Sequence, residues 1–235
     1  MNKLFNIYIG YDGVESVAWH VMAHSIFSKS SIPVAFIPVS VNNLQGVYDR
    51  VRDPKQSNEF SFTRFLVPYL NNYQGYAVFF DCDMLVRTDI NELLELIKAD
   101  PDKAVYVVKH DYVPKDTVKY LNTVQYTYPR KNWSSVVVWN CGHPDNQRLT
   151  PDFINTATGI ELHRFTWLKD EDIGELDIRW NWLVGEYDNP PNDVKNVHWT
   201  IGGPYFTEYS DADFAKEWFD GRDKINFCKQ RDPKK

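Results

Sequence analysis

The sequence is organised around the stretch Gly75-Tyr76-Ala77-Val78-Phe79-Phe80-Asp81-Cys82-Asp83-Met84-Leu85-Val86. Its apolar residues predict a buried strand that ends in two aspartates one residue apart. Because successive strand side chains alternate faces, Asp81 and Asp83 can point the same way while Cys82 turns into the core. Two carboxylates beside an open position suit Mg²⁺ or Mn²⁺ bound to a phosphate. The alternative is that both aspartates cap a loop.

Length and composition limit the class of protein. The chain has 235 residues, of which 43% are apolar and 25% charged, and its net charge is −6. These values predict one globular domain over residues 1–235, ending in a short basic tail at 229–235. An acidic chain without a basic patch is not expected to bind nucleic acid. No apolar run approaches the ~18 residues of a membrane helix, so no integral membrane segment is expected.

Cysteine usage and the N-terminal residues predict a cytoplasmic location. The three cysteines, Cys82, Cys141 and Cys228, are odd in number and lack metal-site spacing. This pattern is typical of a reduced protein. Residues 1–9 lack the basic start and long apolar region of a signal peptide.

A strand–helix–strand unit precedes the two aspartates. Leu4–Ile9 and Pro33–Val39 are predicted strands, and residues 14–25 carry apolar side chains at helical spacing. Such a unit predicts an α/β domain of Rossmann-like type, with a mostly parallel central sheet flanked by helices. Ligands of these sheets bind beyond the carboxyl ends of the strands, where Tyr11 and Asp12 lie and could contact a nucleotide. Asp12 as a simple turn former fits the local sequence equally well.

Arg64 lies just ahead of the aspartate strand, in a helix predicted over residues 60–69 that ends or kinks at Pro68. It occupies a different helix face from the apolar Phe62 and Phe65. Arg64 is therefore either a solvated surface residue or a partner for a phosphate, and we favour the phosphate partner.

Two further segments carry residues that could bind a metal or a phosphate or take part in catalysis. His198 precedes Gly202-Gly203; an imidazole can ligate Mn²⁺, and glycine amides can approach a phosphate closely. The alternative is a buried core histidine. The second segment is the acidic run Asp170-Glu171-Asp172, in which a carboxylate could serve as base, nucleophile or acceptor for a sugar hydroxyl. Its alternative is a solvated acidic turn.

Five of these segments occur together, in this order: Tyr8-Ile9-Gly10-Tyr11-Asp12, Arg64, Phe79-Phe80-Asp81-Cys82-Asp83, Asp170-Glu171-Asp172 and His198-Trp199-Thr200-Ile201-Gly202-Gly203. The set resembles the GT-A glycosyltransferases, most closely the retaining family that contains glycogenin and bacterial lipopolysaccharide galactosyltransferases. The resemblance covers most of residues 4–205.

This resemblance implies a nucleotide-sugar fold in which Asp81, Asp83 and His198 hold Mn²⁺, or Mg²⁺, on the diphosphate. It also implies that Tyr11 and Asp12 contact the base or ribose and that Arg64 lies on the donor side. The implied donor is a nucleotide sugar, with a UDP-sugar favoured, and the acceptor is a glycan or another hydroxyl compound. The implied setting is glycan or lipopolysaccharide synthesis.

The sequence departs from that family at three places. Gly203 is followed by Pro204-Tyr205-Phe206, where the family carries a lysine and a Pro-Trp pair. Glu171 stands where the family has glutamine between two aspartates, and Trp133, next to Asn132, stands where it has a sugar-contacting asparagine.

The sequence therefore predicts a metal-dependent glycosyltransferase in which Asp170 and Glu171 are the candidate catalytic residues, and the resemblance alone implies retention of configuration. In this interpretation, the Gly202 and Gly203 amides stabilise the leaving diphosphate. Two alternatives remain. Asp81 could be the nucleophile of a phosphatase of the haloacid dehalogenase type, or the chain could be a non-catalytic module that binds carbohydrate or nucleotide.

Overall fold

The computed structural model describes residues 4–53, 56–115, 118–119, 121, 123–124 and 129–226; the predicted basic tail and Cys228 lie outside these ranges. The strands are β1 (Phe5–Gly10), β2 (Val34–Val39), β3 (Tyr76–Phe80), β4 (Met84–Val86), β5 (Val105–Val107), β6 (Val118–Lys119), β7 (Thr123–Val124), β8 (Val136–Asn140), β9 (Ile173–Glu175), β10 (Trp182–Leu183) and β11 (Asn196–His198). The α-helices are α1 (Ser16–Phe27), α2 (Val67–Leu70), α3 (Asn91–Ala99), α4 (Pro151–Thr156), α5 (Gly159–His163) and α6 (Ala215–Asn226).

The central sheet has six strands in the order β2-β1-β3-β8-β5-β9. β1 pairs in parallel with β2 and β3, and β5 pairs in parallel with β9. β8 runs antiparallel to both of its neighbours, β3 and β5. The predicted α/β class with a mostly parallel sheet is thus confirmed, with β8 as the reversed strand.

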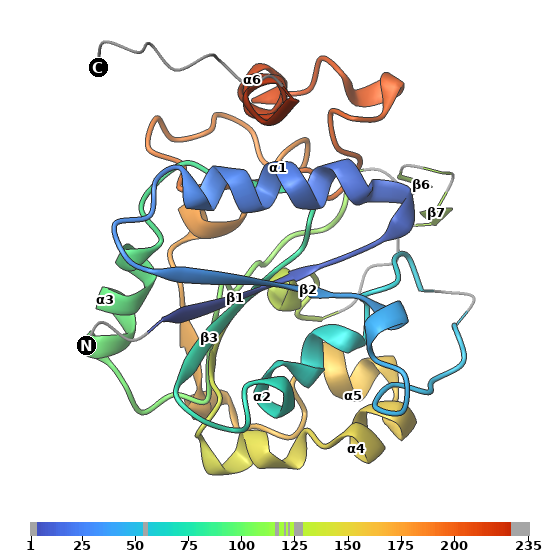
Figure 1. The fold of residues 1–235 in the computed structure, drawn as a ribbon, viewed down its shortest axis with the longest axis vertical. Coiled ribbons are helices and arrows are strands. Elements are labelled where there is room, and N and C mark those ends of the chain that lie inside the picture. Colours follow the sequence, from blue (N-terminus) through green and yellow to red (C-terminus); the bar gives the residue numbers. More distant parts are fainter. Residues whose placement is uncertain are drawn as a thin grey trace, which may run out of the picture.

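Helices cover both faces of this sheet. In Figure 1, α1 lies on one side with α6 outside it, and α2, α4 and α5 lie on the other. The inward faces of these layers form the main core, in which β3 is buried from Ala77 to Phe80. A purely apolar strand such as β3 is the kind that a sheet covered on both faces requires.

The predicted strand–helix–strand unit forms as β1, α1 and β2, within two residues of the predicted bounds. The predicted helix over residues 60–69 takes a different form. A 3₁₀ helix, Thr63–Leu66, leads into α2, and Pro68 lies in the first turn of α2. A proline is tolerated there because its missing N–H would have no partner within the helix.

The chain leaves the central sheet at the end of β3 and enters a second sheet at β4. This second sheet has the order β10-β11-β4, and β11 runs antiparallel to β4 with His198 opposite Met84. The backbone N–H of Trp199 also donates to the carbonyl oxygen of Asp83, at 3.0 Å. Asp81-Cys82-Asp83 is therefore the junction of the two sheets, and Cys82 is fully buried as predicted.

Within the described ranges, no helix combines the length and the apolar character needed to cross a membrane.

The aromatic part of the core predicts a large stability effect at Trp139. This fully buried β8 residue stacks on Trp167, with ring centroids 6.5 Å apart, and meets the edge of Phe65. We expect Trp139→Ala to lower the free energy of unfolding by about 3–5 kcal/mol, because it removes the ring and leaves a cavity. Urea titration measures the change. Val51→Ala, at a side chain 88% exposed, is the control and should change it by no more than about 0.5 kcal/mol. A loss below about 1 kcal/mol at Trp139 would contradict this account.

Candidate functional site

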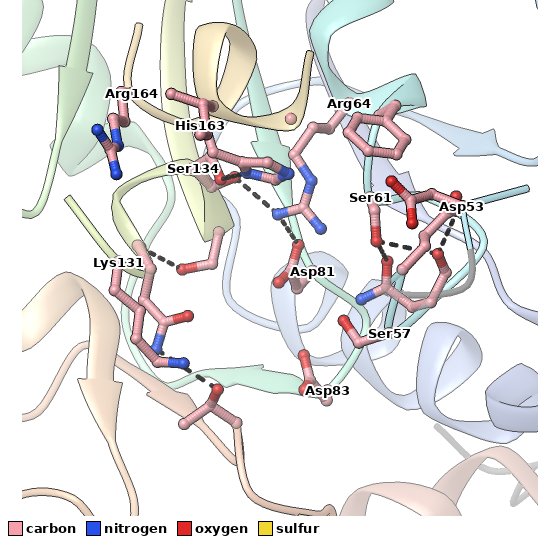
Figure 2. A pocket seen from close by; sticks show the side chains of 18 of the residues that line it. Asp53, Ser57, Ser61, Arg64, Asp81, Asp83, Lys131, Ser134, His163 and Arg164 are labelled. Atoms are coloured by element: carbon pink, nitrogen blue, oxygen red, sulfur yellow. Dashed lines mark hydrogen bonds and ion pairs between the residues drawn. The ribbon is translucent and has the colours of Figure 1, made fainter. Parts of the chain in front are cut away.

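A cavity of about 470 Å³ opens where β3 ends and β8 begins. Its walls come from the loop before α2, the Asp81–Asp83 junction, the turn before β8, the start and end of α5, and the segment after β11. Its charged lining residues, among those described, are Asp53, Arg64, Asp81, Asp83, Lys131 and Arg164. Figure 2 shows Arg64 and Asp81 near the middle of this cavity. The position agrees with the rule that ligands of open α/β sheets bind beyond the carboxyl ends of the strands.

Arg64 and Asp81 form a buried ion pair in this wall. The distance from Arg64 Nη1 to Asp81 Oδ1 is 2.7 Å, and Arg64 is 4% exposed. The guanidinium also donates to the carbonyl oxygens of Phe60 and Ser134. These bonds fix the Asp81 carboxylate and compensate its buried charge. The interpretation of Arg64 as a solvated surface residue is wrong.

Asp83 and His198 lie beside this pair. His198 Nε2 is 3.4 Å from Asp83 Oδ1, and both residues are buried. Asp81, Asp83 and His198 each offer one ligand atom, and these atoms lie within 4.8 Å of one another. The structure therefore brings together the three residues that the sequence predicted as metal ligands.

The hydrogen bonds of Asn181 define the tautomer of His198. The amide nitrogen of Asn181 donates to the carbonyl oxygen of Asn132, at 3.3 Å, and to Ser135 Oγ, at 2.8 Å. A carbonyl oxygen only accepts, so the other end of the amide, Oδ1, must face His198 Nδ1, at 2.9 Å. A neutral His198 then carries its proton on Nδ1 and presents the Nε2 lone pair towards Asp83.

This donor set fits a divalent cation. A lone pair and two carboxylates that converge in a buried site repel one another unless a positive charge lies among them. Two carboxylates and one imidazole nitrogen are suitable ligands for Mn²⁺, and the carboxylate oxygens are also suitable ligands for Mg²⁺. The ordered Asn181 contact supplies the outer support that such histidine ligands commonly have.

His163 is an uncharged member of the wall. Burial, together with the nearby Arg64 and Arg50 guanidinium groups, lowers its pKa from 6.5 to about 3. Its Nδ1 is 2.8 Å from Ser134 Oγ, and its ring meets that of Phe65 edge-on. At neutral pH, His163 therefore offers hydrogen bonding without charge.

Tyr11 and Asp12, predicted to contact the nucleotide, are not among the lining residues. Asp12 Oδ1 accepts from the N–H of Val14, and Asp12 Oδ2 accepts from the N–H of Glu59, each at 3.0 Å. Asp12 thus caps the turn after β1 and ties it to the loop before α2. Contact of either side chain with a base or ribose stays a prediction.

Gly202 and Gly203 are not among the described residues that line the cavity. A Cβ at Gly202 would meet the Tyr209 ring at 2.3 Å, and one at Gly203 would meet the Tyr205 ring at 2.2 Å. The Gly202 N–H donates to the carbonyl oxygen of Trp199. Close approach of rings therefore explains both glycines, and a role for their amides at a phosphate stays a prediction.

The candidate catalytic carboxylates, Asp170 and Glu171, do not line the cavity. They lie in a 3₁₀ turn, Asp170–Asp172, and their side chains are 88% and 74% exposed. Asp170 pairs with Arg130, and Glu171 pairs with Lys169. Their catalytic role stays a prediction that this arrangement does not support.

The site also contains residues that the sequence analysis did not predict. Asn181, His163 and Arg164 stand among aromatic residues in the sequence, and nothing in their spacing marks them as site residues. An amide residue between two tryptophans, as in Trp180-Asn181-Trp182, is the one sequence signal that could have drawn attention to Asn181.

Solved structures with the same fold are glycosyltransferases. The bifunctional glycosyltransferase WbbM aligns with 94% of this chain and 50% of its own (TM-score 0.57, 16% identity). GlyE of Streptococcus pneumoniae TIGR4 aligns with 94% of this chain and 60% of its own (TM-score 0.62, 12% identity). The galactosyltransferase LgtC, in complex with donor and acceptor sugar analogues, aligns with 96% of this chain and 98% of its own (TM-score 0.61, 12% identity). The chain thus has the GT-A fold, and it spans only about half of WbbM and GlyE.

Sequence comparison identifies the family. Protein CDI of Arabidopsis thaliana is 47% identical over 230 residues, which make up 95% of this chain and 88% of that protein. The chain belongs to the family of Protein CDI. No protein-family model matches it.

The Asn181 contact predicts an effect on metal affinity. Asn181→Leu keeps similar bulk but removes the acceptor that holds the Nδ1 proton of His198, so the Nε2 lone pair is no longer fixed towards Asp83. We expect Mn²⁺ affinity to fall by about 10- to 100-fold. Electron paramagnetic resonance of free Mn²⁺ measures this, and Asn42→Leu, at an exposed residue, is the control. Wild-type affinity in folded Asn181→Leu protein would contradict the assignment.

The depressed pKa of His163 predicts acid sensitivity. Because the unfolded state takes up a proton near pH 6.5 and the folded state only near pH 3, stability is present above pH 6.5 and is lost as the pH falls towards 3. His163→Gln should reduce the slope of unfolding free energy against pH by up to about 1.4 kcal/mol per pH unit in this window. Urea titrations from pH 7.5 to 4.5 compare the two proteins. Parallel curves would show that His163 does not titrate as described.

Proposed function

We propose that the protein is a divalent-metal-dependent glycosyltransferase that moves a sugar from a nucleotide-diphosphate sugar to an acceptor hydroxyl. The observation that carries the proposal is the convergence of Asp81, Asp83 and His198 Nε2 beside Arg64, in the wall of a cavity large enough for a small ligand. The GT-A fold and the family resemblance of the sequence support the same class of reaction.

Each residue of this cluster has a separate task. Asp81 and Asp83 provide carboxylate oxygens, and His198 provides a lone pair whose direction Asn181 fixes. Arg64 holds Asp81 in place and adds one positive charge near the position of the diphosphate. When bound, a divalent ion neutralises charge that builds on the leaving diphosphate, a Lewis-acid effect worth several kcal/mol.

The finer parts of the proposal rest on other grounds. A UDP-sugar donor, a glycan or similar hydroxyl acceptor, and retention of configuration are proposed from the resemblance to the retaining family. LgtC, with its donor and acceptor sugar analogues, supports a site that takes both kinds of ligand. A cytoplasmic location is proposed from the free, buried thiols of Cys82 and Cys141.

The two alternatives differ from this proposal in measurable ways. A phosphatase with Asp81 as nucleophile would form an aspartyl phosphate, and a binding module would hold nucleotide without turnover. The ion pair of Asp81 Oδ1 with Arg64 gives that oxygen a positioning role, which supports the glycosyltransferase proposal over the phosphatase.

The metal site predicts nucleotide release that depends on Mn²⁺. In a panel of nucleotide sugars, we expect at least one donor to release its nucleotide in the presence of Mn²⁺. This release should stop when a chelator is added. Asp83→Asn should slow this release by about 100-fold or more, because the ligand charge is lost while the shape is kept. Asp220→Asn, on the outer helix α6, is the matched control and should keep wild-type rates.

The proposal fails if no donor in the panel shows metal-stimulated nucleotide release. Nucleotide binding without release would favour the binding module. Release that is unchanged in Asp83→Asn would remove the metal cluster from the reaction.

A further inference from the structure

Arg164 is a cavity residue whose side chain has no partner among the residues that the structure describes. It follows α5 and lines the cavity. Its Nε is buried and makes no hydrogen bond, and its guanidinium forms no ion pair with any residue that the structure describes. Figure 2 shows Arg164 on the opposite side of Ser134 and His163 from Asp83. It therefore lies apart from the metal cluster.

Three other arginines in this part of the structure have partners, in contrast to Arg164. Arg50 donates to the carbonyl oxygens of Ile154 and Ala157. Arg64 pairs with Asp81, and Arg130 pairs with Asp170. A half-buried guanidinium without hydrogen bonds is costly because its donors lose water and gain nothing in exchange. These three arginines have partners, and Arg164, which lines the cavity with Arg64, has none among the residues that the structure describes.

The wall around Arg164 is suited to an anion. Lys131 is another cation of the cavity lining, and Thr158 and Ser134 add hydroxyl groups to it. His163 is neutral there, since burial lowers its pKa to about 3. A planar guanidinium binds a carboxylate or phosphate through two parallel hydrogen bonds, which a neutral hydroxyl cannot match.

We infer that Arg164 forms an anion subsite that binds a carboxylate or phosphate group of a substrate, separate from the diphosphate. This inference rests on the proposed function, which assigns the diphosphate to the side of Asp81, Asp83 and His198. The same chemistry has two possible sources: an acidic sugar on the donor, or an acidic group on the acceptor.

Calorimetry with paired probes tests the subsite and separates its sources. For the donor, UDP-glucuronate is compared with UDP-glucose in the presence of Mn²⁺. For the acceptor, glucuronate and glucose 6-phosphate are compared with glucose, with and without UDP and Mn²⁺. We expect the acidic member of at least one pair to bind wild-type protein roughly tenfold to a hundredfold more tightly than its neutral counterpart.

Variants at Arg164 assign that preference to its side chain. Arg164→Gln should abolish it, and Arg164→Lys should retain part of it, because the charge remains but the paired donors are lost. Arg222→Gln removes the same charge from α6, which lies at the opposite end of the molecule from α5 in Figure 1. This variant should leave the preference intact. UDP with Mn²⁺ should bind wild type and Arg164→Gln equally.

Folding provides a second measurement. Because Arg164 makes no side-chain bond in the described structure, Arg164→Gln should melt at or above the wild-type temperature without ligand. A clearly lower melting temperature would indicate a structural role and overturn the inference.

Equal binding of the acidic and the neutral probe in all three comparisons would also overturn it. Failure of UDP to bind with Mn²⁺ would count against the proposed function alone, since glucuronate and glucose 6-phosphate without nucleotide still test the subsite.

Discussion

The antiparallel pairing of β4 with β11 is the constraint on which the site depends. It places His198 opposite Met84, so a residue more than a hundred positions along the chain comes to lie beside Asp83. The Trp199 N–H to Asp83 carbonyl bond extends this pairing by one step. Strand registers are specified by the buried faces on both sides, so a slip by one residue would turn the imidazole away from the carboxylates. The geometry of the metal cluster is therefore a property of backbone pairing as much as of side chains.

Electrostatics explains why the cluster needs its outer residues. Carboxylates are stable in a buried wall only if positive charge or hydrogen bonds compensate them. Arg64 does this for Asp81, whereas Asp83 faces Nε2 of His198. Asn181 keeps that imidazole in place through bonds to Ser135 and the Asn132 backbone. The cluster is thus arranged for a cation rather than for internal neutrality.

Sequence reasoning identified the parts of this arrangement that depend on local pattern. The apolar run that ends in Asp81 and Asp83 can be recognised from a short stretch of sequence. The helical spacing that places Arg64 apart from Phe62 and Phe65 can be recognised in the same way. The hydrogen-bond and ion-pair partners of these side chains could not be predicted from the sequence. Whether a guanidinium is paired, as at Arg64, or unpaired, as at Arg164, depends on which carbonyls and carboxylates the fold brings near it. The same limit applies to Asp170 and Glu171, because spacing does not determine which way an acidic turn faces.

The late glycine segment acts on the site by a route that its sequence does not suggest. The Gly202 and Gly203 backbones leave room for the Tyr209 and Tyr205 rings. The Tyr205 hydroxyl then donates to Glu15 Oε2, at 2.6 Å, and the Cys82 thiol lies 3.7 Å from the same oxygen. Burial and the Glu15 charge raise the pKa of Tyr205, so its hydroxyl remains a donor at neutral pH. One buried carboxylate thus joins the glycine segment, the turn before α1 and the Asp81–Asp83 junction, and Gly203 permits this contact by leaving room for the Tyr205 ring.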